Sequence, residues 1–415
     1  MNITRPVALF SSSSVLGGGE KKEEEEERKN PFYISRSISE SLSRYEEGFV
    51  RFLPRFTEIS ELFRHLECYR FEICEANTRA FVIPHHADVE TIFFVSQGRG
   101  TVTLVKQNQR ESYEVEKGDV MKVDAGTTVY TINHSDKERL QMVKLVQSRN
   151  APGDYEIYFG AGGENPKSFY RVFSDEVLEA AFNTTRDGLH KVFEQQTRGA
   201  VVGASEEQIK ALTQHAKSSK GSKAEGKGPF NLLQSPAIHS NKFGQLFEVT
   251  PSDLKGLQDL DSSVSFVQLN QGGMMAPFFN SKATKIVYVV EGDGSFEILS
   301  PQGQGSPFQS RGEVTKTVHY EKFNGRLLPG VMVVVPAGYP VTFVASQSEN
   351  LQLVAFGVNA QNNEKHFLAG KESILNQLER EALELSFNTR AEEVEQILNN
   401  QKDSYFVAAS QGVWV

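Results

Sequence analysis

The chain has 415 residues and a mass of 46.3 kDa, which is enough for two ordinary domains, each with its own core. Its 39% hydrophobic and 23% charged residues are typical of a soluble globular protein, and no apolar run approaches the roughly 18 residues of a membrane span. Acidic residues outnumber basic ones by 53 to 44, and the resulting net charge of -9 argues against a general nucleic-acid binder.

Two stretches of low complexity divide the chain. Residues 1–29 combine a Ser/Gly run with five consecutive Glu, and this composition predicts a disordered or processed acidic leader without a convincing signal peptide. Residues 216–228 are rich in Lys, Ser and Gly and are predicted to form an exposed linker. The folded parts are then residues 30–215 and 229–409, followed by a short tail, 410–415.

The chain contains two cysteines, Cys68 and Cys74. If both lie on one extended strand, their Cα atoms are about 20 Å apart, well beyond the reach of a disulfide. We therefore expect a fold without a covalent cross-link, which leaves the redox compartment open.

The two halves repeat each other. An apolar strand, a Gly-x-Gly turn and a second strand occur in both, as do a later Gly-bounded strand and the tripeptide Phe-Asn-Thr. The matching pairs are Ile92–Val102 with Ile286–Phe296, Gly118–Gly126 with Gly330–Gly338, and Ala181–Thr184 with Ser386–Thr389. Three ordered matches at nearly constant offset predict an internal duplication.

Each half opens with short β-branched and aromatic runs separated by turn residues, a pattern typical of an antiparallel sandwich or closed roll. Each half then changes to helical spacing of apolar residues, and Ser205-Glu-Glu-Gln predicts a capping box. The apolar faces of these helices either pack on their own roll or form a subunit contact. The predicted helical segments are Asp175–Phe182, Asp187–Gln195, Ser205–Ala216, Lys371–Phe387 and Ala391–Asn400.

The duplicated Gly-centred motifs resemble those of the bicupins, and the detailed sequence resembles the vicilins, the 7S globulin seed storage proteins of plants. The stretches that carry the resemblance are Asn30–Tyr33, Gly48–Phe56, Ile83–His86, Phe230–Leu233, Ser240–Pro251, Asn280–Gly292 and Phe367–Gly370. The resemblance implies a mainly β fold of two tandem cupin jelly-roll barrels, each followed by a short helical bundle. It also implies a homotrimer joined through these helices, and deposition in the protein storage vacuole, by way of the secretory pathway, as a nutrient reserve.

Catalytic cupins bind a transition metal through three His and one Glu. Of the corresponding positions in the two halves, only His86 keeps a ligand, so we predict no metal, no catalytic residues and no enzyme. Adjacent His85 and His86 point to opposite faces of a strand and cannot chelate one ion without a bulge. The positions are Pro84, His86, Thr91 and Val129 in the first half, and Phe278, Asn280, Lys285 and Val341 in the second.

A pocket without a metal can still bind a ligand. Lys285 replaces the family carboxylate, and a buried lysine must lose its proton or find an anion. This predicts a small carboxylate near Lys285 and Asn280, unless Lys285 is satisfied by backbone carbonyls or bends out to solvent. In the first half, Arg79, His86, Asn133 and Lys144 are the candidate ligand-binding residues for a similar anion, so a small carboxylate is expected in each barrel.

Asn183 begins a glycosylation sequon near a helix end and is the candidate acceptor. Three functions follow from the sequence: a storage protein, a binding module for small anions or metabolites, and, with least support, a residual metal-dependent enzyme. None of them calls for a nucleic-acid or membrane partner.

Overall fold

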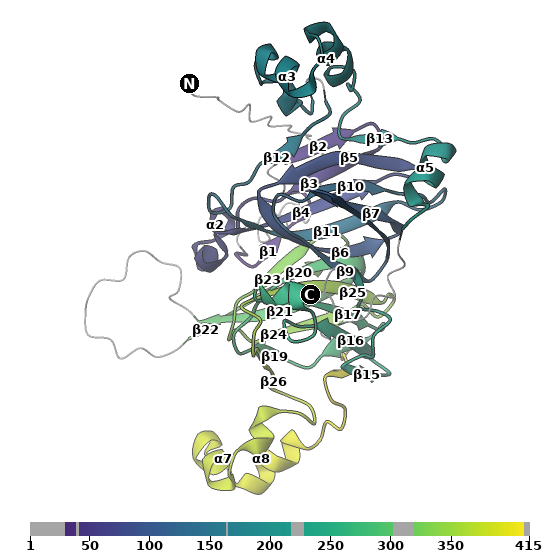
Figure 1. The fold of residues 1–415 in the computed structure, drawn as a ribbon. Helices are drawn as coiled ribbons and strands as arrows, with labels where there is room; N and C mark the ends of the chain where they lie inside the picture. Colours follow the sequence, from purple (N-terminus) through teal and green to yellow (C-terminus); the bar gives the residue numbers. More distant parts are fainter. Residues whose placement is uncertain (1–29, 39–40, 163–164, 217–227, 302–318, 411–415) are drawn as a thin grey trace, which may run out of the picture.

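The structure is a computed structural model that describes residues 30–38, 41–162, 165–216, 228–301 and 319–410. The predicted leader (1–29) and nearly all of the predicted linker and tail lie outside these residues. The described residues form two β-barrels stacked on each other, with helical extensions at opposite ends of the molecule (Figure 1). The predicted fold of two β-rolls with helical extensions is confirmed.

The first barrel is built from two antiparallel sheets. The strands of one sheet are, in spatial order, β14 (Phe230–Asn231), β9 (Asp119–Val123), β6 (Val89–Gln97), β11 (Leu140–Ser148), β4 (Tyr69–Ala76), β3 (Gly48–Phe52) and β2 (Ser41–Tyr45). Those of the other are β12 (Ile157–Phe159), β5 (Ala80–Ala87), β10 (Thr128–Ile132), β7 (Arg99–Lys106) and β8 (Gln109–Glu116), with β13 (Val201–Gly203) also paired to β5.

The second barrel repeats this plan. One sheet contains β1 (Tyr33–Ile34), β23 (Met332–Val335), β20 (Thr284–Gly292), β25 (Leu351–Val358), β17 (Ser262–Leu269), β16 (Gly244–Val249) and β15 (His239–Asn241). The other contains β22 (Tyr320–Leu327), β21 (Gly294–Pro301), β24 (Val341–Ala345), β18 (Gly273–Met275) and β27 (Phe406–Ala408), with β19 (Phe278–Asn280) pairing both β24 and β26 (Lys365–Phe367).

Two short strands cross between the barrels and correct the predicted domain boundaries. β1 comes from the first half but pairs with β23 of the second barrel, and β14 comes from the second half but pairs with β9 of the first. Phe32, beside β1, is fully buried and packs edge-on against Phe323 and Tyr339. Each half therefore supplies an edge strand that satisfies backbone groups of the other barrel.

One large hydrophobic core lies between the barrels, because the facing sheets bury aromatic side chains against each other. Phe71 of β4 contacts Tyr288 and Phe356 of the second barrel, and Phe94 of β6 stacks on Phe266, with ring centroids 5.7 to 5.8 Å apart. Aromatic pairs at this spacing contribute beyond the area they bury. The two barrels thus share one hydrophobic core.

The turns that mark the duplication are confirmed as structurally equivalent. Gly98 and Gly292 have φ of 78° and 95°, and a Cβ atom at either position would lie within 2.0 Å of a carbonyl oxygen, that of Arg139 or of Asn350. Only glycine fits such a turn, which explains why the Gly-x-Gly motif occurs in both halves. Both cysteines are free, as predicted.

The helical extensions each contain a helix pair joined by a left-handed Asn: α3 and α4 around Asn183, and α7 and α8 around Asn388. The predicted capping box at Ser205 is confirmed. The predicted helix Lys371–Phe387 is not continuous, because Leu378 is extended and separates η3 from α7. No helix among the described residues is long and apolar enough to cross a membrane. The helices are α2 (Phe56–Ile59), η1 (Glu61–Leu66), η2 (Phe169–Arg171), α3 (Asp175–Phe182), α4 (Arg186–Phe193), α5 (Glu206–Thr213), α6 (Lys255–Gln258), η3 (Ile374–Gln377), α7 (Arg380–Phe387) and α8 (Ala391–Leu398).

Candidate functional site

Each barrel encloses a cavity between its sheets. The first cavity, in the first barrel, has a volume of about 70 Å³, and the second cavity, in the second barrel, has about 30 Å³. Thr91 on β6 and Lys285 on β20 occupy equivalent places in the duplication, and each lines its cavity. Most of the remaining lining is aliphatic, so the few polar side chains decide what each cavity can hold.

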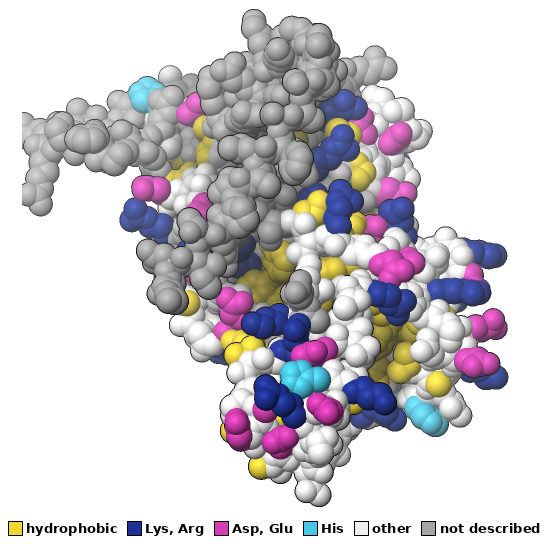
Figure 2. All heavy atoms as spheres, turned by 90° about the horizontal axis from the view of Figure 1, so that it is seen from above, with side chains coloured by type: hydrophobic (Ala, Val, Ile, Leu, Met, Phe, Trp, Pro, Cys, Tyr) yellow, Lys and Arg dark blue, Asp and Glu magenta, His cyan; other side chains and the backbone are white. Residues whose placement is uncertain are grey.

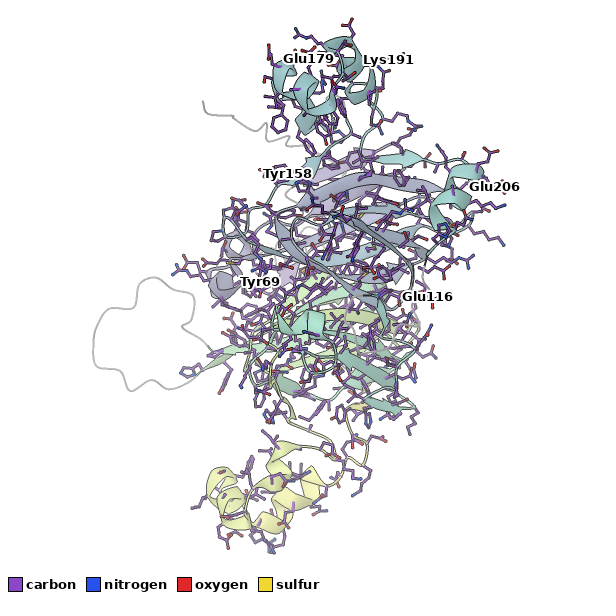
Figure 3. All side chains as sticks on the ribbon, viewed as in Figure 1. Tyr69, Glu116, Tyr158, Glu179, Lys191 and Glu206 are labelled. Carbon is purple, nitrogen blue, oxygen red and sulfur yellow. The ribbon has the colours of Figure 1, made fainter. Side chains whose placement is uncertain are left out.

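A β-bulge decides which histidine faces the first cavity. Where β10 advances two residues, β5 advances three, from Val82 to His85, so the alternation of side chains shifts by one position. His85 therefore lines the cavity. His86 stacks on Tyr158 with ring centroids 5.0 Å apart, at the end of the barrel nearest α3 and α4 (Figure 3). His86 is therefore not among the residues that line the first cavity, where it was expected.

His85 is a neutral hydrogen-bond acceptor. Its Nδ1 lies 2.9 Å from the carbonyl oxygen of Ile83, which can only accept, so Nδ1 carries the hydrogen and donates it. Burial lowers the pKa of His85 to about 4, outweighing the bond to Ile83, which raises it, and the Lys144 ammonium lowers it further. At neutral pH the Nε2 atom is therefore unprotonated.

Lys144 lines the first cavity as predicted, but it has a carboxylate partner there. Its Nζ lies 2.5 Å from Oε1 of Glu72 on the neighbouring strand β4, and the Tyr155 hydroxyl donates to Oε2 of Glu72 at 2.9 Å. Burial lowers the pKa of Lys144, but the Glu72 carboxylate outweighs burial and the pKa is raised. The lysine is therefore protonated, and the Glu72 carboxylate beside it balances its charge.

Arg79 and Asn133 do not line the first cavity, and both predictions are wrong. Arg79 is exposed in the turn before β5 and forms an ion pair with Asp136. Asn133 is fully buried, but its Nδ2 donates to three backbone carbonyls at 2.8 to 3.2 Å and its Oδ1 accepts from the N–H of Ser135. The amide of Asn133 therefore fastens a loop, and its Nδ2 hydrogens are all used by backbone carbonyls.

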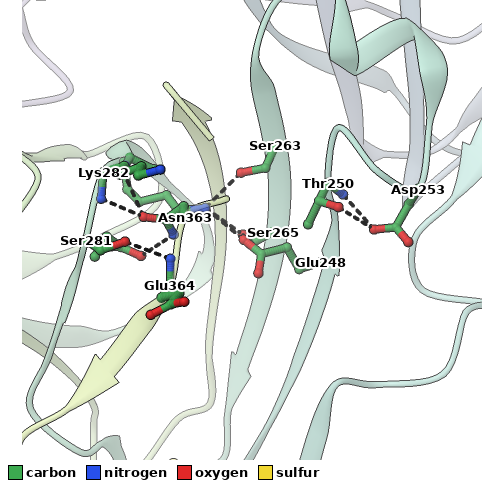
Figure 4. Close-up of polar contacts among 12 residues, drawn as sticks. Glu248, Thr250, Asp253, Ser263, Ser265, Ser281, Lys282, Asn363 and Glu364 are labelled. Atoms are coloured by element: carbon green, nitrogen blue, oxygen red, sulfur yellow. Dashed lines mark hydrogen bonds and ion pairs between the residues drawn. The ribbon is translucent and has the colours of Figure 1, made fainter. Parts of the chain in front are cut away.

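Lys285 lines the second cavity, as predicted. It neither bonds to backbone carbonyls nor bends out to solvent. Its Nζ donates to Oε1 of Glu248 at 2.8 Å and to the hydroxyls of Ser263 and Ser265 at 2.9 and 3.4 Å. Figure 4 labels these three partners, Glu248, Ser263 and Ser265. Burial raises the pKa of Glu248, but the ammonium groups of Lys285 and Lys365 outweigh burial and lower it to about 2. Glu248 is therefore ionised.

Lys365 and Asn280 are cross-strand partners on β26 and β19, and both line the second cavity. Burial lowers the pKa of Lys365. Its Nζ lies 5.6 Å from the ring centroid of Phe278, and it has no hydrogen bond or ion pair with any described residue. Asn280 accepts from Asn363, but its own Nδ2 is buried without a partner. The second cavity thus contains an ammonium group and an amide N–H donor that have no hydrogen-bond partner among the described residues.

The sequence analysis missed His85, Glu72, Glu248 and Lys365. A signal existed for Glu72, because it stands in β4, where every residue is buried, and a charge in such a strand needs a partner. His85 required knowledge of the bulge, and Lys365 lies on a short strand with no distinctive pattern.

Among the described residues, no group of three or more His, Cys, Asp or Glu side chains is placed to hold a metal ion. Thr91 and Val129 in the first cavity, and Lys285 and Val341 in the second, stand where catalytic cupins carry ligands. The Lys285 ammonium and the two valines offer no lone pair to a metal, and Thr91 offers a neutral hydroxyl in place of the carboxylate, so these four positions do not fit the cupin metal centre.

Known proteins share this architecture. A family model described as Cupin matches residues 66–187 and 230–395. A vicilin from Corylus avellana is 45% identical over 381 residues, covering 91% of this chain and 83% of that protein. The solved vicilin of Capsicum annuum is 43% identical, with a TM-score of 0.86, and covers 92% of this chain and all of that one.

A further solved structure, from Solanum melongena, is 39% identical with a TM-score of 0.86 and covers 92% of this chain and 98% of that one. Its description reports different anionic ligands in structurally similar pockets. The duplicated cupin barrels, the missing metal ligands and the full-length similarity agree. The chain belongs to the vicilin family, the 7S globulins, and is a non-catalytic seed storage protein.

Proposed function

We propose that this storage protein is deposited as a homotrimer, that the helical extensions make the subunit contacts, and that proteolysis later mobilises it. The supporting observation is the apolar surface of the extensions. Val177 and Phe182 on α3 are 53% and 46% exposed, and Leu385 and Ile397 on α7 and α8 are 87% and 72% exposed. Large exposed apolar groups gathered on one element mark association surfaces.

The placement of the extensions fits a closed ring. They lie at opposite ends of the chain's long axis (Figure 1), and hydrophobic side chains lie among charged ones in the view onto the end that carries α3 and α4 (Figure 2). A head-to-tail contact between two different surfaces generates a ring when the rotation closes. The extension of one subunit would then cover the opposite extension of the next.

Native mass spectrometry tests the trimer. We expect a mass of three 46.3 kDa chains for the wild type, and monomers for Leu385→Asp, because a charge in the contact would be left unpaired. Ile238→Asp is the control, since Ile238 is 51% exposed but lies outside both extensions. A monomeric wild type, or a trimer that survives Leu385→Asp, would contradict the proposed contact.

The protein storage vacuole, reached through the secretory pathway, is the compartment we propose for this storage form. Support comes from the family alone, and fractionation of seed protein bodies with an antibody to this chain tests it. Recovery in another fraction would contradict the proposal.

Asn183 stays a predicted glycosylation site. It is exposed at the end of α3, as is Thr185, which completes the sequon. We expect the intact mass of the protein from seeds to fall on treatment with an N-glycosidase. A mass that does not change would exclude this modification.

A second function is favoured for the second cavity, where we propose that a small carboxylate binds between Lys365 and Asn280. The cavity of about 30 Å³ is smaller than a carboxylate such as acetate requires, so binding includes a movement of the side chains that line it. Two lysines face one carboxylate there, so the walls carry one excess positive charge, and the Asn280 Nδ2 has no partner. An anion would compensate the charge and accept from both groups. The anionic ligands described for the Solanum melongena relative support this proposal.

Calorimetric titration with acetate tests the second cavity. We expect one site per chain in the wild type and none in Lys365→Met, because the excess charge is then removed. Lys371→Met, at an exposed position, is the matched control and should bind like the wild type. Equal acetate binding by Lys365→Met and the wild type would overturn this part of the proposal.

A further inference from the structure

The first cavity differs from the second in having no charge to spare. Within its wall, Lys144 and Glu72 form a close pair, and Tyr155 occupies the other carboxylate oxygen. At the rim, Asp124 pairs with Lys106 at 2.8 Å and with Lys122 at 3.1 Å. An anion entering this cavity would give up its hydration without meeting an uncompensated cation, which is costly.

The first cavity does offer an unused acceptor. Because Nδ1 of His85 donates to the Ile83 carbonyl, Nε2 presents a lone pair, and no described residue donates to it. A lone pair repels an anion and attracts an N–H or O–H group. This acceptor is therefore selective for a neutral or cationic donor.

An unused donor lines the same cavity from the other sheet of the barrel. The Lys144 ammonium has three hydrogens, and Glu72 is its one hydrogen-bond partner among the described residues. The ammonium therefore has hydrogens left for a carbonyl oxygen. The ligand that satisfies both His85 and Lys144 therefore contains a donor and an acceptor. A neutral ligand also avoids the cost of burying a charge in a cavity whose own charges are already paired.

The remaining wall sets the size and polarity. Aliphatic and aromatic side chains such as Val82, Val102 and Phe93 make up most of it, and the volume is about 70 Å³. This is roughly half of the ~150 Å³ that accommodates benzene in an engineered apolar cavity. A molecule of about four non-hydrogen atoms fits such a space.

We propose that the first cavity is a binding site for a small neutral carboxamide, whose N–H group donates to Nε2 of His85 and whose carbonyl oxygen accepts from Lys144. The two cavities of one chain then select ligands by charge: a neutral amide in the first and a carboxylate in the second. The proposal for the first cavity depends neither on the trimer nor on anion binding in the second.

Acetamide and acetate test this selectivity, because they have nearly the same shape and differ in charge. We would label the intact protein with ¹⁵N-histidine and follow the side-chain Nε2 resonance of His85 while each compound is added. We expect a saturable shift with acetamide, because a new hydrogen bond forms at Nε2, and no shift with acetate. His85→Phe should lose the shifting resonance, which assigns it to His85, and His86→Phe should keep it.

Two results would overturn the proposal. One is a saturable shift of His85 with acetate and none with acetamide. The other is no shift with either compound up to the highest concentration at which the protein stays folded, which would mean that the cavity holds water alone. The same titrations with Lys365→Met separate the two proposals, since this variant removes acetate binding in the second cavity and should leave the acetamide response of His85 unchanged.

Discussion

The two cavities occupy equivalent places in a duplicated fold, yet their walls carry different charges. In the first, Ala87 on β5 and Ile157 on β12 are paired, and both line the cavity. In the second, Asn280 and Lys365 form the corresponding pair on β19 and β26. An amide and an ammonium thus stand where the first barrel has a methyl and a branched alkyl group.

The difference shows how a duplicated backbone acquires separate binding properties. Beside each cavity lies a lysine–glutamate pair, although on different strands: Lys144 with Glu72 on β11 and β4, and Lys285 with Glu248 on β20 and β16. Each pair is internally neutral. The charge of each cavity is therefore set by what is added to the pair, which is Lys365 in the second cavity and neutral His85 in the first.

The largest effect is expected from breaking the pair in the second cavity. Lys285→Met leaves Glu248 ionised and buried without its closest cation, and we expect a loss of about 3–5 kcal/mol in the free energy of unfolding. Urea unfolding measures it. Lys282→Met, three residues away and exposed, should change stability by less than about 0.5 kcal/mol. Equal stability of the two variants would show that the pair is not needed.

The next effect concerns the histidine of the first cavity. The pKa of His85 is about 4 in the folded protein and about 6.5 in an unfolded chain, so the unfolded state binds the proton first as pH falls. Neutral His85 should therefore cost no stability above pH 6.5. As pH falls toward 4, the free energy of unfolding should decrease by on the order of 3 kcal/mol.

Urea midpoints at neutral and acidic pH, compared between variants, isolate this contribution because the other titrating groups are shared. His85→Phe should lose less stability on acidification than the wild type does. His86→Phe should behave like the wild type, since His86 lies outside the cavity. If His86→Phe lost less stability on acidification and His85→Phe behaved like the wild type, His86 and not His85 would line the cavity.

A smaller change should convert the first cavity into an anion site. Glu72→Gln removes the carboxylate and keeps an amide for Tyr155, which leaves the Lys144 ammonium uncompensated. We expect acetate affinity in the first cavity to rise by at least about tenfold, or ~1.4 kcal/mol, by calorimetry. Glu67→Gln, at an exposed position, should not gain a site. If Glu72→Gln did not raise the acetate affinity of the first cavity, the charge of the cavity wall would not control anion binding.

The smallest effect is a pH dependence of acetate binding in the second cavity. Burial places the pKa of Lys365 below its ordinary 10.5, and acetate binds the protonated form. Affinity should therefore fall as pH rises toward the ordinary lysine pKa of about 10.5, beginning at a lower pH than for an ordinary lysine. Calorimetry across this range checks it, and an affinity independent of pH would exclude Lys365 as the binding cation.

The sequence predicts the duplication, the barrels with helical extensions, the family, and the places of Lys144, Asn280 and Lys285 in cavity walls. These follow from motifs and periodicity, which depend on local spacing. His85 could not be predicted because one bulge residue reverses which side chains face inward. Lys365 was missed because its position depends on pairing between β19 and β26, far apart in sequence.

The exchanged strands were missed for a related reason. β1 and β14 are two residues long and contain no pattern that distinguishes one barrel from the other. Their place is decided by the burial of Phe32 and by unpaired edges of the opposite barrel, which are properties of the assembled fold.

A crystal structure of the wild-type protein, grown without carboxylates and then soaked in acetate, tests the central claim that the two cavities differ in charge. We predict acetate beside Lys365 and Asn280 in the second cavity and none between His85 and Lys144 in the first. Acetate in the first cavity with none in the second, or equal occupancy of both, would contradict the account.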